Sequence, residues 1–192
     1  MDINPAKKQL RFARRALDDM KASQDLDDAE RNWNSFLNHI EQVFEKIKIA
    51  CSTVCKKYPS FISPINAQRS SDPLLVYLKQ ARNALHHGIK EIAERDPAHV
   101  TQTISGDVVS VDKLVMKQGV VVEYSGSNPI HTYLVPERIV VVDIVNRMVR
   151  YPVPTHHLGC PIHTLNPIEI GEHGFAYYDN FLSMVEAELI NN

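Results

Sequence analysis

Apolar residues recur every three or four positions through most of the first half of the chain, which is the period of an α-helix with one buried face. This pattern predicts helices over residues 4–20, 27–54 and 73–95. Asp72 can cap the third helix and Pro73 suits its first position. Residues 60–73 contain two prolines and a serine cluster, which predicts a break in helical structure. The expected core residues are Leu10, Ala13, Leu17 and Met20, then Trp33, Phe36, Leu37, Ile40, Val43, Phe44 and Ile47, then Leu74, Leu78, Ala81, Leu85, Ile89 and Ile92.

The apolar period changes to two near Asp96, where short runs rich in valine begin. We expect four to six antiparallel strands between residues 100 and 153, with hairpin turns near Gly119 and Asn146. Residues 152–168 contain four prolines and predict an extended loop. One last amphipathic helix is predicted by the spacing of Phe175, Tyr178, Leu182, Val185 and Leu189.

The expected fold class is therefore α+β, within 192 residues. A helical bundle would span residues 1–98, a β-rich segment with the proline-rich loop residues 99–170, and a C-terminal helix residues 171–192. A lone terminal helix must bury its apolar stripe, so it is expected to pack back on the bundle. The small antiparallel β-rich segment would then be an insertion before the last helix, and whether it forms a separate domain stays open.

Composition restricts the class of protein. With 44% hydrophobic and 23% charged residues, the chain is not a disordered segment or a coiled-coil rod. No window reaches the roughly 18 consecutive apolar residues of a membrane-spanning helix, so no membrane partner is expected. The basic start of the chain has no apolar segment behind it, which argues against a signal peptide. Three cysteines, an odd number, favour a reducing compartment. We therefore expect a cytoplasmic protein.

Charge is divided unevenly between the two halves of the chain. Residues 1–98 carry 16 Lys and Arg against 13 Asp and Glu, whereas residues 99–192 carry 5 against 10. One face of the first helix forms a basic stripe, which could bind RNA phosphates or could be a solvated helix face. The residues of this basic stripe are Lys7, Lys8, Arg11, Arg14 and Arg15.

The third helix contains the most informative segment, ARNALHHG at residues 81–88. On a straight helix Asn83 and His87 lie about 40° apart, as do Arg82 and His86, whereas Arg82 and His87 lie about 140° apart. An imidazole can move a proton at neutral pH and a guanidinium can stabilise a phosphorane-like transition state, so this set suits phosphoryl transfer. The alternative is ordinary surface decoration of a helix.

At these residues the sequence resembles the HEPN superfamily, helical domains marked by an RNxxxH motif that Arg82, Asn83 and His87 match. The resemblance covers residues 5–95 and extends to residues 174–190. It implies a metal-independent endoribonuclease in which His87 is the acid/base, Arg82 binds the scissile phosphate and Asn83 orients it. His86 is an addition to the pattern and would share the proton transfer. The β-rich insertion departs from the family pattern.

The resemblance also implies partners. HEPN proteins usually form homodimers with facing motifs, and many belong to toxin–antitoxin or phage-defence systems. We therefore expect RNA as substrate, a homodimer, and a protein antitoxin or regulator as a further partner, with no cofactor. The alternative is a non-catalytic dimeric binding module that docks a protein or a small ligand through its β-rich segment.

The proline-rich loop offers a second chemistry. His157, Cys160 and His163 are residue types that bind zinc, and their spacing lets one loop supply three ligands. His131 or His173 could provide a fourth ligand. A turn-rich loop that contains histidines without binding metal is the alternative, and Cys51 and Cys55 are expected to pack as small apolar residues on one helix face.

Overall fold

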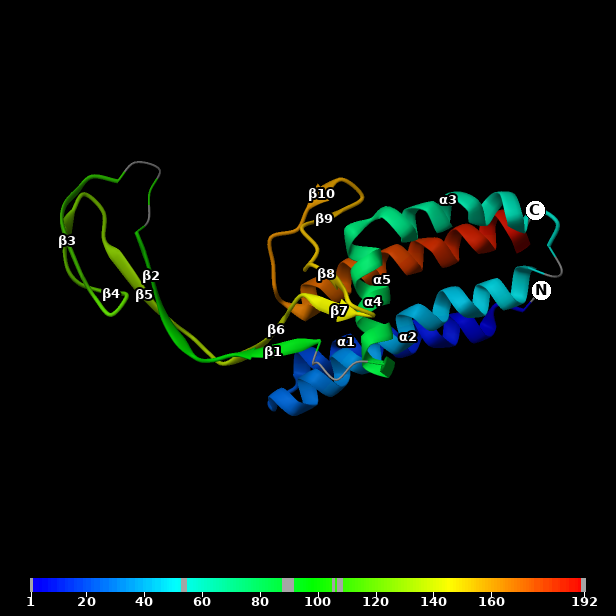
Figure 1. Ribbon diagram of the computed structural model, residues 1–192, viewed down its shortest axis with the longest axis horizontal. Coiled ribbons are helices and arrows are strands. Elements are labelled where there is room, and N and C mark those ends of the chain that lie inside the picture. The colour runs from blue at the N-terminus through cyan, green and yellow to red at the C-terminus, as the bar shows by residue number, and fades with distance from the viewer. Residues whose placement is uncertain (1, 53–54, 88–91, 105, 107–108, 191–192) are drawn as a thin grey trace. The chain divides into compact units, whose positions relative to one another are not determined.

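The computed structural model describes residues 2–52, 55–87, 92–104, 106 and 109–190, and the side chains of residues 86, 87 and 190 lie outside the description. The fold is α+β, as the sequence predicts (Figure 1). The helices are α1 (Asn4–Ala22), α2 (Leu26–Ser52), α3 (Tyr58–Ser71), α4 (Pro73–His87) and α5 (Pro167–Val185), which continues into the π-helix η1 (Glu186–Ile190). The strands are β1 (Ala93–Asp96), β2 (His99–Ile104), β3 (Val111–Lys117), β4 (Val120–Gly126), β5 (Ile130–Val135), β6 (Arg138–Val141), β7 (Ile144–Asn146), β8 (Val149–Tyr151), β9 (His156–His157) and β10 (Cys160–Pro161).

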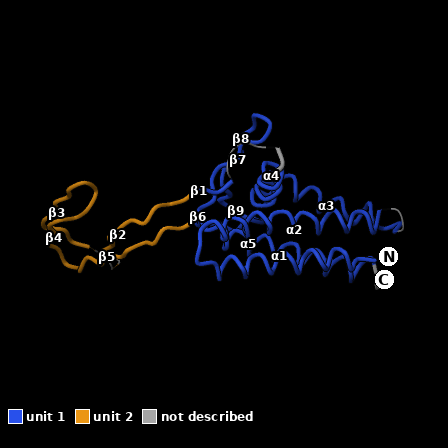
Figure 2. Tube along the Cα trace, turned by 90° about the horizontal axis from the view of Figure 1, so that it is seen from below, with its two compact units in different colours: residues 1–94, 139–192 blue, residues 95–138 orange. Residues whose placement is uncertain are grey.

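The chain divides into two units (Figure 2). Unit 1 comprises residues 1–94 and 139–192, and unit 2 comprises residues 95–138. All the described sheets are two-stranded: β1 pairs with β6, β2 with β5, β3 with β4, β7 with β8, and β9 with β10. The hairpins expected near Gly119 and Asn146 are present as β3–β4 and β7–β8.

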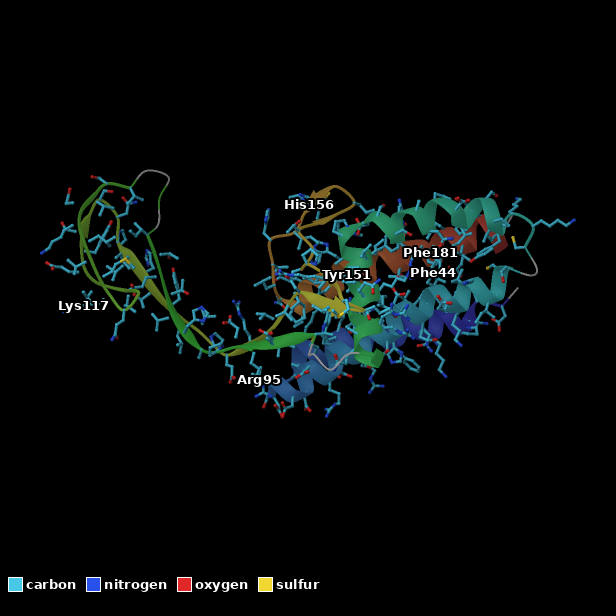
Figure 3. The ribbon with its side chains drawn as sticks, viewed as in Figure 1. Phe44, Arg95, Lys117, Tyr151, His156 and Phe181 are labelled. Carbon is cyan, nitrogen blue, oxygen red and sulfur yellow. The ribbon has the colours of Figure 1, made fainter. Side chains whose placement is uncertain are left out.

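Unit 1 is a helical bundle in which α4 crosses the other four helices steeply (Figures 1 and 2). α5 packs on α1 and α2, so the last helix returns to the bundle as predicted. All the expected core residues of α1 and α2 are buried, and Phe44 and Phe181 stack in the interior with ring centroids 5.8 Å apart (Figure 3). The burial confirms the helical periodicity read from the sequence.

Four sequence predictions need correction. Residues 60–71 do not break the helix, because Phe61, Ile62 and Ile65 give α3 a buried face that outweighs Pro64 in its interior. The third helix does not reach residue 95, since residues 93–96 form β1. The loop over residues 152–168 contains the short hairpin β9–β10 and the start of α5. Residues 100–153 hold more strands than the four to six expected, because short ladders replace long ones.

Part of the expected β-rich segment belongs to the bundle. Ile139, Val141, Ile144 and Ile162 are buried in the same core as the helices. The strands β6 to β10 therefore cover the bundle, and only residues 95–138 form a unit of their own.

A buried polar network joins three helices inside unit 1. Arg69 donates to Glu41 Oε2 at 2.6 Å and, through Nε, to the hydroxyl of Tyr178 at 3.2 Å. The Tyr178 hydroxyl donates to Glu41 Oε1 at 2.7 Å, and burial raises the pKa of Tyr178 well above its usual value. The guanidinium also lies 3.5 Å from the ring centroid of Phe44. Each buried charge is thus paired and hydrogen-bonded, which a buried ion requires.

We expect Glu41→Ala to lower the free energy of unfolding by about 3–5 kcal/mol, because it leaves the Arg69 guanidinium buried without its counter-ion. Urea unfolding followed by circular dichroism measures the loss. The matched control is Glu45→Ala, one turn along α2 at an exposed position, which should change stability by less than about 0.5 kcal/mol. Equal stabilities of the two variants would contradict this role for the network.

Candidate functional site

The motif residues Arg82 and Asn83 lie in the third turn of α4, whose start is fixed by Asp72. Asp72 Oδ1 accepts the N–H of Leu75 at 3.0 Å, which confirms the predicted N-cap. Leu74, Leu78 and Ala81 are buried, as the sequence predicts, whereas Lys79 is exposed and Gln80, Arg82 and Asn83 are partly exposed. The packing of α4 on the bundle therefore leaves its polar side free for a site.

Arg82 and Asn83 contact each other. Arg82 Nη1 donates to Asn83 Oδ1 at 3.3 Å, while Arg82 Nε is buried without a hydrogen-bond partner among the described residues. The side chains of His86 and His87 lie outside the described residues, so the RNxxxH geometry stays a prediction.

A pocket of about 390 Å³ opens beside Asn83, between α4 and the β7–β8 hairpin. Both chain segments belong to unit 1. None of the described lining residues is acidic, and two are cations. The lining residues are Lys79, Gln80, Asn83, Asn146, Arg147, Val149 and Tyr151. Two cations and three amides in one concave surface suit an anion with several oxygens, such as a phosphate.

Hydrogen bonds hold this hairpin against α4. Asn146 Nδ2 donates to Gln80 Oε1 at 2.8 Å, and the hydroxyl of Tyr77 donates to the carbonyl of Val142 at 2.8 Å. Burial raises the pKa of Tyr77 well above its usual value, so this hydroxyl remains a donor. The pocket wall is therefore attached to the motif helix at two points.

Asp143 stabilises the hairpin itself. Its Oδ1 accepts the N–H of Val153 at 2.9 Å and its Oδ2 accepts Arg150 Nε at 2.7 Å. These contacts, the Val153 N–H first, lower the pKa of Asp143. The carboxylate closes the base of β7–β8 and keeps its turn at the pocket.

The turn of this hairpin has an unusual backbone. Arg147 and Met148 have φ of 49° and 68°, the left-handed region that non-glycine residues rarely adopt. A tight hairpin normally uses Asn-Gly there, so these two residues carry conformational strain. The turn presents Arg147 to the pocket, whereas Met148 is 97% exposed.

Carboxylates of α5 and η1 pair with part of the basic stripe on α1. Arg14 donates to both oxygens of Glu172, at 2.7 and 2.5 Å, and Lys21 reaches the same carboxylate at 2.5 Å. Lys7 pairs with Glu186. The Arg14 hydrogen bonds, followed by those of Lys21, outweigh burial and lower the pKa of Glu172 to about 2. These ion pairs fasten α5 and η1 to α1.

The rest of the stripe is more open. Arg15 Nε lies 3.6 Å from Asp19 at an exposed position, and the ammonium of Lys8 lies 5.5 Å from the ring centroid of Phe12. Arg11 is exposed. RNA binding by the whole stripe stays a prediction, and Lys7 and Arg14 are already engaged in ion pairs with η1 and α5.

No complete zinc ligand set forms among the described residues, although the rings of His157 and His173 lie 6.3 Å apart. His157 and Cys160 are partners in the β9–β10 ladder, and Cys160 and His163 are exposed. His157 Nδ1 instead lies 3.0 Å from Asp72 Oδ1, and its ring packs edge-on against Tyr177 at 5.9 Å. Among the described residues no group of three His, Cys, Asp or Glu side chains could hold a metal ion.

Asp72 is buried and accepts several hydrogen bonds, whereas the sequence predicted it only as a helix cap. Besides Leu75 and His157, it accepts the N–H of Leu158 at 2.7 Å through Oδ2. Burial acts to raise its pKa, but the hydrogen bonds from Leu158, His157 and Leu75 outweigh burial and lower it. The carboxylate is therefore charged, and it ties the β9–β10 hairpin to the start of α4.

A second cavity of about 520 Å³ lies between α2 and α3. Phe44, Tyr58 and Ile62 form its apolar part and also belong to the bundle core. Lys48 is a charged residue in its wall. The pocket at Asn83 is the stronger candidate because it alone of these two contains a residue of the motif.

Sequence reasoning missed most residues of the pocket. Lys79 stands one helical turn before Asn83, so its place on that side of α4 was visible in the spacing. Arg147 follows the predicted turn at Asn146, but no pattern in the sequence placed that hairpin against α4. Gln80 and Asn146 are ordinary polar residues with no distinguishing spacing.

Comparison of the chain with protein-family models, with curated proteins and with solved structures finds no match. The resemblance to the HEPN superfamily therefore rests on the motif alone. Among the described residues, no helix combines the length and the apolar character that crossing a bilayer requires.

The Glu172 contacts predict a pH dependence of stability. The pKa of Glu172 falls from 4.5 to about 2 on folding. The charged carboxylate therefore stabilises the folded protein at any pH above its pKa in the unfolded chain, and this stabilisation is lost as the pH falls through its pKa in the folded protein. We expect the thermal midpoint of the wild type to exceed that of Glu172→Gln at pH 7, and the difference to shrink between pH 4.5 and 2. Calorimetry or circular dichroism across this range measures it.

Glu188→Gln is the control for this experiment, because Glu188 is an exposed carboxylate in the same C-terminal part of the chain. Its midpoint should follow the wild type at every pH. A constant difference between wild type and Glu172→Gln from pH 7 to pH 2 would show that the carboxylate charge is not what stabilises the contact.

Proposed function

We propose that this protein is a metal-independent endoribonuclease of the HEPN type, as in toxin–antitoxin or phage-defence systems. The pocket between α4 and the β7–β8 hairpin would receive the scissile phosphate. One observation carries the proposal: the pocket opens at the motif residue Asn83 and is lined by the cations Lys79 and Arg147. Cations attract the phosphodiester and amide donors orient its oxygens.

The motif residues supply the chemistry in this proposal. His87 removes the proton of the 2′-hydroxyl or protonates the leaving oxygen, and His86 shares the proton transfer. The 2′-oxygen attacks phosphorus while the bond to the 5′-oxygen breaks, which leaves a 2′,3′-cyclic phosphate and a 5′-hydroxyl. Arg82 stabilises the charge that develops on the phosphate.

The proposed setting is the cytoplasm. Cys51, Cys55 and Cys160 are all free thiols, which fits a reducing compartment where RNA is present. An antitoxin or regulator that holds the nuclease in check is part of the same proposal.

We expect the wild type to cleave a labelled oligoribonucleotide in EDTA and His87→Ala to cleave it about 10²–10⁴-fold more slowly, because the proton transfer is lost. The products should carry a 2′,3′-cyclic phosphate, and a substrate with 2′-deoxyribose at the cleavage position should resist. Gel analysis of time courses measures both. His156→Ala, an exposed histidine on β9, is the matched control and should retain full activity.

The pocket makes a separate contribution to the same assay. Lys79→Ala with Arg147→Ala should weaken RNA binding and reduce its dependence on salt, because two phosphate contacts are removed. Lys113→Ala with Lys117→Ala, which removes two exposed cations of unit 2, should leave both unchanged. Cleavage by wild type and His87→Ala at one rate, or no cleavage by the wild type, rejects the nuclease.

The second candidate function is a non-catalytic binding module, which we keep because unit 2 exposes many large apolar side chains. Contiguous exposed apolar surface marks interaction sites. A wild type that binds RNA poorly and leaves it intact, while still associating through residues 95–138, would favour this function over the nuclease.

A further inference from the structure

The pocket beside Asn83 has more room than a phosphate group needs. Its volume of about 390 Å³ falls within the range of about 300–1,000 Å³ in which proteins hold small organic ligands. The cations Lys79 and Arg147 can bind an anionic group, but the other described lining residues are uncharged. A ligand that fills the pocket therefore has a second part that carries no charge.

The β7–β8 hairpin supplies an apolar wall to this pocket. Across the ladder Asn146 pairs with Val149, and Ile144 pairs with Tyr151. Paired residues and residues two apart in a strand lie on the same face, so these four side chains share one face of the hairpin. Ile144 is buried in the core of unit 1, and Asn146 reaches α4, so this face is turned towards the bundle.

Tyr151 is the aromatic residue of that wall. It lies at the end of β8 (Figure 3), is partly buried against the core of unit 1, and lines the pocket together with Val149. Val149 keeps 50% of its surface exposed. A ring beside a branched aliphatic side chain suits a flat heterocycle, because every nucleobase has a π-face that stacks on aromatic side chains.

The amides of the pocket add polar contacts with fixed positions. Asn146 Nδ2 donates to Gln80 Oε1 at 2.8 Å, which joins the hairpin to α4 within the pocket lining. The other atoms of this amide pair, Gln80 Nε2 and Asn146 Oδ1, are a donor and an acceptor that lie outside this bond. Unpaired bases of RNA are recognised by hydrogen bonds to their edges in addition to stacking. The amide pair therefore suits the edge of a base.

One hairpin carries both kinds of contact. Arg147 stands at its turn and Tyr151 at the end of its second strand, while Asp143 closes its base through Val153 and Arg150. The separation between the cation and the ring is therefore set by the hairpin itself. A nucleotide requires such a combination, since its sugar joins a phosphate to a base.

We propose that this pocket holds one unpaired nucleotide of an RNA chain, with the phosphate at Lys79 and Arg147 and the base against Tyr151. This base subsite rests on the proposed function, because it adds a base to the phosphate that the pocket would receive there. It makes the β7–β8 hairpin the element that selects the substrate. A base stacked within a duplex does not reach Tyr151, so single-stranded RNA fits and duplex RNA does not.

The test is isothermal titration calorimetry of the full chain with three kinds of probe that share a phosphate: nucleoside monophosphates, ribose 5-phosphate and inorganic phosphate. The nucleoside monophosphate with the best-fitting base should bind at least about 10-fold more tightly than ribose 5-phosphate, because its base stacks on Tyr151. Tyr151→Leu keeps an apolar side chain against the core but removes the ring, so it should abolish this difference and leave the affinity for inorganic phosphate unchanged. Tyr151→Phe keeps the ring and should preserve the difference.

Tyr133→Leu is the matched control, because Tyr133 is an exposed tyrosine of unit 2, and its nucleotide affinity should equal that of the wild type. Circular dichroism checks that each variant is folded. Equal affinities for the nucleotides and ribose 5-phosphate overturn the base subsite, and so does a lack of measurable binding of any probe. A difference that Tyr151→Leu leaves in place also overturns it, because the base then lies elsewhere.

The base subsite and the nuclease fail separately, because nucleotide binding and RNA cleavage are different measurements. A wild type that binds the nucleotide through Tyr151 but leaves RNA intact rejects the nuclease and keeps the subsite. A wild type that cleaves single-stranded and duplex RNA at one rate, and binds ribose 5-phosphate as tightly as the nucleotides, rejects the subsite and keeps the nuclease.

Discussion

The buried carboxylate of Asp72 is the contact on which the candidate site depends. It caps α4 through Leu75 and, 85 residues further along the chain, binds His157 and Leu158 of the β9–β10 hairpin. Because several donors satisfy one charge, the carboxylate stays ionised although it is buried, and its pKa lies below the usual value. The cap fixes where α4 begins, and its helical geometry then places residues 79–83 two turns later beside the β7–β8 hairpin.

The two units are stabilised by different means. Unit 1 buries aromatic and aliphatic side chains from every helix, and it encloses the pair of Arg69 and Glu41 with a full set of hydrogen bonds. Unit 2 has backbone ladders and two hydrogen bonds between the Gln102 amide and the backbone of Val121. None of its described side chains is buried. A backbone hydrogen bond within the protein replaces one to water and contributes little net free energy to folding. Strand ladders without apolar burial are therefore only marginally stable. Residues 95–138 therefore have less apolar burial to stabilise them than the bundle has.

The apolar periodicity of the sequence predicted those features of the fold that depend on residues close together in the chain. The stripes on α1, α2 and α4 are local patterns, and the residues from Trp33 to Ile47 that they place in the core are buried. Two prolines and a serine cluster predicted a break over residues 60–73, but burying Phe61 and Ile65 outweighs the one hydrogen bond that Pro64 removes from α3. The pocket was beyond sequence reasoning, since Asn83 and Arg147 are 64 positions apart in the chain and meet only through tertiary contacts.

Ion pairs within unit 1 account for part of the uneven charge of the sequence. Two of the acidic residues late in the chain, Glu172 and Glu186, pair with Arg14, Lys21 and Lys7 of α1. Two of the five residues of the basic stripe, Lys7 and Arg14, are therefore paired within the fold, which reduces the field of the stripe on a distant polyanion. Lys79 and Arg147 line a pocket without any acidic described residue, so their charge is concentrated where it meets the motif helix. The placement of these two cations favours an anionic ligand at one point of the surface.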